Sequence, residues 1–356
     1  MRISKNSVSS FLTICVLGLI IIISAGYFMN KTTDYQVSPS LSEEFLENSS
    51  PIYIDGLDPN NNWETFAANN PSIIGMGEPG NAYMIYGLLI DAKGGSSCIT
   101  IKNSNVLFQI DNSVFFNTSQ GDNSAGIYLE NVSYGFILNS DFYDHGSNGI
   151  TLINSRYLTI WGNSFHNNRG TGIYFSGTSS CTILENIINE HEGNGIELYN
   201  NQEIAIYENN ISVSGHSAFQ LTKTTNSIII NNIISHSYNG ITLEDSRHNT
   251  ITYNNISHID ENGIILQENS RYNTISYNKI SYAFYCISIG SSSYGTHLKN
   301  NEASLIRTFK EVSIPPSPLP QTNGDSGNLL PLLGYFVVVV AFCVVIIRKS
   351  NKYSIC

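Results

Sequence analysis

The fold follows from two neighbouring segments, Asn239-Gly240-Ile241-Thr242-Leu243 and Asn249-Thr250-Ile251-Thr252-Tyr253-Asn254-Asn255-Ile256-Ser257. In both segments apolar, mostly β-branched residues alternate with polar ones, and this period of two indicates short strands with one buried face. The first segment recurs along the chain at a constant spacing that is shorter by one position at a single step. Its copies open at Gly126, Gly149, Gly172, Gly195, Ala218, Gly240, Gly263 and Cys286. The middle of the chain is therefore an internal repeat.

Each repeat contains three apolar positions separated by polar turns, so we expect three short strands per unit. One unit cannot bury its apolar face alone, but copies stacked at the strand spacing of ~4.8 Å form parallel sheets around a common core. A recurrent asparagine follows the second strand and should form a ladder between rungs through its side-chain amide. Its members, at the constant spacing of the repeat, are Asn163, Asn186, Asn209, Asn232, Asn255, Asn278 and Asn301.

These units resemble the repeats of NosD-like proteins, which belong to the pectin-lyase-like superfamily and are common on archaeal cell surfaces. The resemblance covers about residues 51 to 305. It implies an all-β fold, a right-handed parallel β-helix of about nine 23-residue rungs, with the asparagine ladder in the turn between the second and third strands. The superfamily includes lyases, hydrolases, epimerases and binding proteins, so the resemblance alone does not select a function.

Two uncharged apolar runs, 11 to 29 and 329 to 347, are each long enough to cross a bilayer. Basic residues flank both on the terminal side, which places both termini in the cytoplasm and the middle outside the cell or in the periplasm. We therefore expect a membrane-anchored protein with terminal transmembrane helices. Its segments are a signal peptide or anchor (1–30), a cap (51–97), the β-helix (98–312), a stalk (313–328), a transmembrane helix (329–348) and a basic cytoplasmic tail (349–356).

The charge distribution argues against nucleic acid as a partner. Five of the 17 Lys and Arg lie at the two ends, so the middle carries 12 bases against 28 acids and repels phosphate backbones. Gly75-Met76-Gly77-Glu78-Pro79-Gly80 has the spacing of a dinucleotide loop, but the proline and final glycine oppose the helix that such a site needs. We expect neither a nucleotide nor a cofactor.

Polar turns of three neighbouring rungs form a candidate catalytic cluster of Asp144, His145, Arg169, Glu190 and His191. A lyase or epimerase acting on a uronate needs a base to remove a proton and a cation to neutralise the carboxylate. His145 or His191 could supply the base and Arg169 the cation. Ordinary solvated turn residues are the alternative interpretation.

A second candidate is a carbohydrate-binding stripe of aromatic residues that recur with the repeat. Trp161, Tyr207 and Tyr253 lie at multiples of the repeat spacing, beside the inward isoleucine column, and should point outward, where exposed rings can stack on sugars. Arg247 and Arg271, in adjacent rungs, could hold an anionic glycan. Local cover for the strands is the alternative role for the aromatic residues.

The resemblance to NosD-like proteins also implies copper handling, for which His145, His191 and His236 are weak candidate ligands. The sequence favours non-enzymatic binding of a polysaccharide, or structural display at the cell envelope. A polysaccharide lyase or C5-epimerase is the first alternative, and metal handling is the second.

Overall fold

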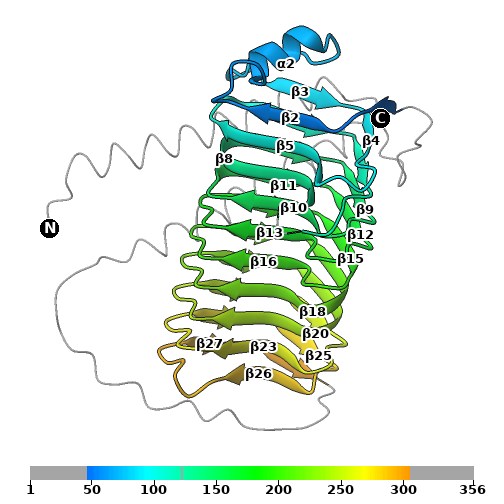
Figure 1. The fold of residues 1–356 in the computed structure, drawn as a ribbon. Helices are drawn as coiled ribbons and strands as arrows, with labels where there is room; N and C mark the ends of the chain where they lie inside the picture. Colours follow the sequence, from blue (N-terminus) through cyan, green and yellow to red (C-terminus); the bar gives the residue numbers. More distant parts are fainter. Residues whose placement is uncertain (1–45, 122, 305–356) are drawn as a thin grey trace, which may run out of the picture.

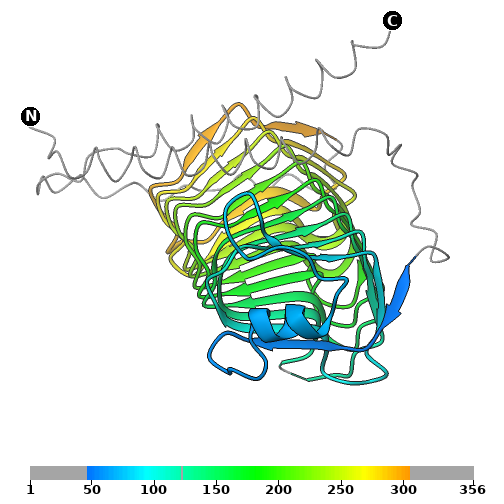
Figure 2. The ribbon, with the colours of Figure 1, turned by 90° about the horizontal axis from the view of Figure 1, so that it is seen from above.

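The protein coils into a rod of about 10 turns (Figure 1), seen in a computed structural model that describes residues 46–121 and 123–304. The predicted membrane segments, stalk and cytoplasmic tail lie outside these residues. Within the described ranges, no helix is long and apolar enough to cross a membrane. Viewed from above, the successive turns lie one behind another with similar outlines (Figure 2). Every neighbouring strand pair among them is parallel, as the repeat predicts.

Each turn contributes one strand to each of three faces, and the long strands β8, β18 and β20 continue from one face to the next. The first face contains β2 (Ile52–Asp55), β5 (Ser97–Ser104), the start of β8 (Ala125–Leu138), β10 (Asn148–Ile153), β13 (Ile173–Ser176), β16 (Ile196–Tyr199), the ends of β18 (Asn210–Thr222) and β20 (Ile233–Glu244), β23 (Asn262–Gln267) and β26 (Tyr285–Ile289). The second contains β3 (Tyr83–Tyr86), β6 (Phe108–Asp111), the end of β8, β11 (Arg156–Trp161), β14 (Thr182–Leu184), β17 (Ala205–Tyr207), β19 (Ile228–Ile230), β21 (Thr250–Thr252), β24 (Thr274–Ser276) and β27 (His297–Lys299). The third contains β1 (Glu47–Ser49), β4 (Leu88–Asp91), β7 (Val114–Phe116), β9 (Asp141–Tyr143), β12 (Ser164–His166), β15 (Ile187–His191), the starts of β18 and β20, β22 (Asn255–Ser257), β25 (Lys279–Ser281) and β28 (Glu302–Ser304).

The core is a set of columns in which one inward residue lies directly on its counterpart in the next turn. Phe115, Phe142 and Phe165 form one such column, with ring centroids 5.0 and 4.7 Å apart. A glycine opens six of the eight repeats, and at these positions the close packing leaves little room for a side chain. A Cβ atom at Gly149 would lie 2.7 Å from the carbonyl oxygen of Gly172, too close for any side chain without movement of the backbone.

The asparagine ladder is present with one correction. Asn163 donates to the Asn186 side-chain oxygen from both its backbone nitrogen (2.9 Å) and its side-chain nitrogen (3.0 Å), and the pattern repeats along the rod. After Asn232 the ladder continues through Asn254, whose side-chain oxygen accepts from the Asn232 backbone at 3.0 Å. The predicted member, Asn255, is instead exposed on β22. The step from Ala218 to Gly240 is one residue shorter than the others, so the ladder asparagine of the repeat that opens at Gly240 is Asn254 and not Asn255.

Helix α2 (Trp63–Asn69) closes the N-terminal end of the rod (Figures 1 and 2). Asn62 caps the helix by accepting from the Thr65 backbone at 2.9 Å. Trp63 stacks on Tyr83 and Phe108 over the open end of the core, with centroids 5.0 and 5.4 Å apart. The segment expected to be a cap also supplies strands, because β2 pairs with β5 and β3 with β6.

Candidate functional site

One loop breaks the regular outline of the rod. The repeat that contains Cys98 is longer than those that follow it, and its surplus lies between Asn117 and Ser124. This loop folds against the first face, where the Tyr128 hydroxyl donates to the Asn123 side-chain oxygen at 3.3 Å. Tyr128 and Thr151 are buried there although their alternation with inward residues directs them outward. The loop therefore makes this part of an otherwise regular surface uneven.

Two adjoining pockets lie beside the loop. The arginine pocket has a volume of about 430 Å³ and is lined by Asn117, Thr118, Ser119, Gln120, Asp144, His145, Gly146, Asn167 and Arg169. The tyrosine pocket has a volume of about 520 Å³ and is lined by Gln120, Gly121, Gly146, Ser147, Asn148 and Tyr174. Gln120 and Gly146 line both pockets, so one extended ligand could occupy the two. The lining is rich in amides and hydroxyls, with one guanidinium, one carboxylate, one imidazole and one phenol ring.

Three of the five predicted catalytic residues, Asp144, His145 and Arg169, line the arginine pocket. Glu190 is exposed within β15 and, like His191, is not part of the lining. The cluster predicted from sequence is therefore only partly brought together. Asp144 and Arg169 are its solvent-exposed members at the pocket.

The two candidate bases, His145 and His191, lie inside the coil rather than on its surface. Both belong to one inward column, in which the His145 backbone donates to the Asn168 side chain (3.0 Å) and the Asn168 backbone to His191 Nδ1 (3.3 Å). Burial lowers the pKa of His145 to about 3 and that of His191 to about 4. Both imidazoles are thus neutral and weakly basic, and His191 acts as a rung of a structural ladder.

A different histidine, His166, makes a surface ion pair. Its Nε2 lies 3.3 Å from Asp141 Oδ1, and this hydrogen bond raises the pKa of His166. The ring of His166 also stacks on Tyr143 with centroids 5.1 Å apart, and Tyr143 stacks on Phe116 at 5.2 Å. These contacts hold His166 on the third face.

The predicted aromatic stripe does not form one exposed column. Tyr207 is only 7% exposed and packs with Leu184 and Ile230, and burial raises its pKa to about 12. Trp161 is half-buried against this cluster. Tyr253 is 55% exposed but belongs to another column, because Ile230 pairs with Thr252 after the shortened step.

The exposed aromatic side chains stack on one another along the rod. Tyr253 and Tyr277 have centroids 4.9 Å apart and an interplanar angle of 5°. His236, His258 and Tyr282 form a second ladder, with centroids 5.0 and 4.5 Å apart. Since the faces of these rings contact each other, the edges point to solvent, and a sugar needs a free face for stacking.

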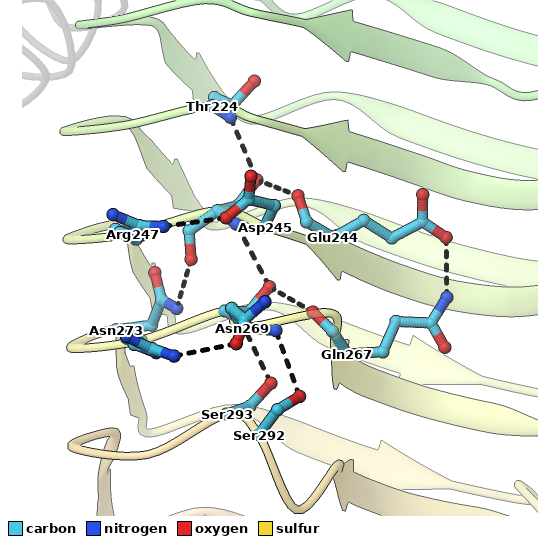
Figure 3. Close-up of polar contacts among 12 residues, drawn as sticks. Thr224, Glu244, Asp245, Arg247, Gln267, Asn269, Asn273, Ser292 and Ser293 are labelled. Atoms are coloured by element: carbon cyan, nitrogen blue, oxygen red, sulfur yellow. Dashed lines mark hydrogen bonds and ion pairs between the residues drawn. The ribbon is translucent and has the colours of Figure 1, made fainter.

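The two predicted glycan-binding arginines are engaged by neighbouring side chains. Arg247 Nη2 lies 2.9 Å from Asp245 Oδ1 (Figure 3). Arg271 Nη2 donates to the Asn269 side chain at 2.7 Å, and its guanidinium lies 4.2 Å from the centre of the Tyr294 ring. Both arginines therefore stabilise the corner between the first and second faces.

The three candidate metal ligands do not converge. His145 and His191 are two turns apart in the inward column, whereas His236 stacks on His258 at an outer corner. In residues 46–121 and 123–304, no group of three or more His, Cys, Asp or Glu side chains is arranged to hold a metal ion.

Tyr174 is the residue of interest that the repeat pattern did not identify. It points outward from β13, and its neighbours in the column are Thr151 and Glu197. Its ring is not among the stacked aromatic pairs of the described residues, unlike those of Tyr253 and Tyr277. The surplus loop was the available sequence signal, because it marked the turn beside which the pockets form.

The fold and these pockets define a class, a parallel β-helix with polar pockets on the outside of its coil. The chain belongs to the right-handed β-helix family, since residues 81–214 and 193–307 match the family described as right handed beta helix region. The assignment confirms the predicted fold and its right-handed coil. A search of curated proteins gives no match.

Solved structures with the same fold act on polysaccharides. A mutant of the periplasmic alginate epimerase AlgG is 12% identical, with a TM-score of 0.50 over 72% of this chain and 85% of that one. The mannuronan C-5 epimerase AlgE6 A-module of Azotobacter vinelandii is 14% identical, with a TM-score of 0.49 over 63% and 78%. The pectate lyase Pel9A is 14% identical, with a TM-score of 0.45 over 77% and 82%. At such identities the likeness concerns the fold.

Proposed function

We propose that this protein binds polysaccharide without chemically changing it, through the arginine and tyrosine pockets. The observation that carries the proposal is the composition of these adjoining pockets. Their amides, hydroxyls, guanidinium and phenol ring suit a sugar chain, whereas the imidazole among the lining residues, His145, is buried and neutral. The pockets, of about 430 and 520 Å³, are shallow and open to solvent, so a sugar chain would lie across them rather than be enclosed.

Each type of side chain in the two pockets would make a different kind of contact with the sugar chain. The side-chain amides of Gln120 and Asn167 can both donate and accept, as sugar hydroxyls do. Tyr174 offers a ring that is not stacked on another described aromatic, and such a ring packs well on the apolar face of a sugar. Arg169 can hold a carboxylate, sulfate or phosphate substituent in a bidentate manner. The ligand is therefore a hydroxyl-rich chain with anionic substituents.

The proposal includes the location of the rod. Apolar runs near both ends would anchor residues 30 to 328 outside the cytoplasm, on the cell surface or in the periplasm, with the basic tail inside. This location agrees with the resemblance to NosD-like surface proteins of archaea. A rod held at the membrane would meet envelope or environmental polysaccharide directly.

The test is to incubate the purified protein with a panel of neutral and anionic polysaccharides, and to follow both retention and chemical change. We expect retention without turnover, and at least a tenfold loss of affinity, about 1.4 kcal/mol, for Arg169→Ala and for Tyr174→Ala. Tyr253→Ala is the matched control, because Tyr253 is exposed but its ring stacks on Tyr277 and presents its edge to solvent. If both pocket variants bind as the parent does, the pockets are not the site.

One observation favours a second candidate, a lyase or C5-epimerase. Asp144 and Arg169 line the same pocket, so a carboxylate base and a cation for the substrate carboxylate are both present. The same incubation tests this function, which predicts an unsaturated or epimerised product that disappears in Asp144→Asn. Formation of such a product would replace the binding-only proposal.

A further inference from the structure

The outward column at one edge of the third face alternates between apolar and amide side chains. In five successive turns its members are Ile187, Asn210, Ile233, Asn255 and Lys279. Ile187 is 53% exposed and Ile233 is 51% exposed, and the asparagines are exposed as well. Because neighbouring turns lie ~4.8 Å apart, each asparagine has an exposed isoleucine directly beside it.

Both asparagines begin the acceptor sequence for N-glycosylation, Asn-x-Ser. The two segments are Asn210-Ile211-Ser212 and Asn255-Ile256-Ser257. In each, the isoleucine is buried in the core, so the asparagine and the serine two residues later lie on the same outer surface. The strand therefore presents both acceptor residues together to solvent.

Of the three other described acceptor sequences, the one at Asn48 is likewise exposed, on β1, whereas those at Asn117 and Asn131 differ in the state of the amide nitrogen. Asn117 Nδ2 donates to Asp91 at 2.8 Å, and Asn131 Nδ2 donates to Asn103 at 2.9 Å. In the part of the chain that the structure describes, the side chains of Asn210 and Asn255 make no such bond. The nitrogen that would form the new bond is thus available at these two positions.

We propose that Asn210 and Asn255 are N-glycosylated and that their glycans cover Ile187 and Ile233. A membrane-bound transferase would supply the glycan from a lipid-phosphate-linked oligosaccharide. Asn Nδ2 bonds to the anomeric carbon, the bond from that carbon to the phosphate oxygen breaks, the lipid phosphate leaves, and the amide loses one proton. The inference rests on the proposed location outside the cytoplasm, but not on polysaccharide binding.

Shielding gives the modification a physical role. Ile187 and Ile233 are each about half exposed on the third face, directly beside the two asparagines, where an attached glycan can contact them. A bulky, hydrated glycan attached beside each of them would cover the apolar side chains and keep the rods apart. The pockets lie on a different part of the coil, so the glycans leave them open.

The experiment is peptide mass spectrometry on the full chain isolated from the membranes of its native host. We expect glycan on the peptides with Asn210 and Asn255, and its complete loss from each peptide in Ser212→Ala and Ser257→Ala, respectively. Asn131→Gln is the control and should leave both glycans in place. Unmodified Asn210 and Asn255 peptides in the parent chain would overturn the proposal, including the case in which Asn117 or Asn131 is modified instead.

A second measurement addresses the covering role. The double variant Ser212→Ala and Ser257→Ala should bind more of a hydrophobic fluorescent dye than the parent, and adding Ile187→Ser and Ile233→Ser should remove the increase. Equal dye binding by parent and double variant would show that the glycans do not cover the isoleucines. Polysaccharide retention by the double variant should match the parent, which separates this test from that of the pockets.

Discussion

The buried histidines His145 and His191 should make the rod sensitive to mild acid. Their pKa values in the folded state are about 3 and about 4, because burial penalises the charged imidazole. An unfolded chain exposes both rings, with a pKa of about 6.5. Between these values the unfolded state binds more protons than the folded state, so stability falls as the pH drops below about 6.5.

The size of the effect follows from the two pKa values. At pH 5 an exposed imidazole is almost fully protonated, which stabilises the unfolded chain by about 2 kcal/mol per ring relative to pH 7.5. Since neither buried ring gains a compensating proton at pH 5, the two together lower the free energy of unfolding by about 4 kcal/mol. This is a large part of the usual stability of a domain.

The assay is urea unfolding followed by tryptophan fluorescence at pH 7.5 and pH 5. Asn168 already occupies the same column between the two histidines, so the double variant His145→Asn and His191→Asn should fit the coil. We expect the variant to lose about 4 kcal/mol less between the two pH values than the parent does. His216→Asn, at an exposed position, is the control. Equal pH dependence in parent and double variant would refute the reasoning.

Three further predictions concern the core, each measured as the free energy of unfolding. Asn186→Ala removes the acceptor for two donors of the preceding turn and should cost roughly 2 to 4 kcal/mol, whereas Asn255→Ala should cost less than about 0.5 kcal/mol. Gly172→Ala would place a Cβ 2.8 Å from a carbonyl oxygen and should cost about 1 to 3 kcal/mol; Gly290→Ala, with 3.3 Å available, should cost less. Phe165→Ala opens a cavity in the phenylalanine column and should cost about 3 to 5 kcal/mol. Equal losses within either matched pair, or a negligible loss for Phe165→Ala, would contradict the corresponding prediction.

The fold could be predicted because the repeat length is a direct consequence of stacking. An inward residue must lie on its counterpart one turn away, so Ile127, Ile150 and Ile173 recur at the repeat length and pair in register. The error at Asn255 arose from counting equal steps along the chain. The ladder step from Asn232 to Asn254 is one residue shorter than the repeat, and the next step, from Asn254 to Asn278, is one residue longer, so the equal spacing is regained there.

The site was harder to predict because periodicity does not say which corner residues turn inward. His145 and Asp144 are adjacent in sequence, yet one is buried in the coil and the other is exposed at the pocket. Asp144 has a φ of 51°, and this left-handed corner reverses the alternation that the strands obey. The turn after Asn117, beside which the pockets form, is longer than the corresponding turns of the described repeats that follow it.

That loop has a consequence for how such a rod can acquire new specificity. Its surplus residues are inserted at a corner, where they leave the hydrogen-bonded register of the turns before and after it intact, as the pairing of β7 with β9 shows. Insertions at other corners would be tolerated for the same reason, and each would shape the surface of only its nearest turns. Insertions at individual corners could therefore change which ligands the rod binds during evolution, while the stacked turns stay constant.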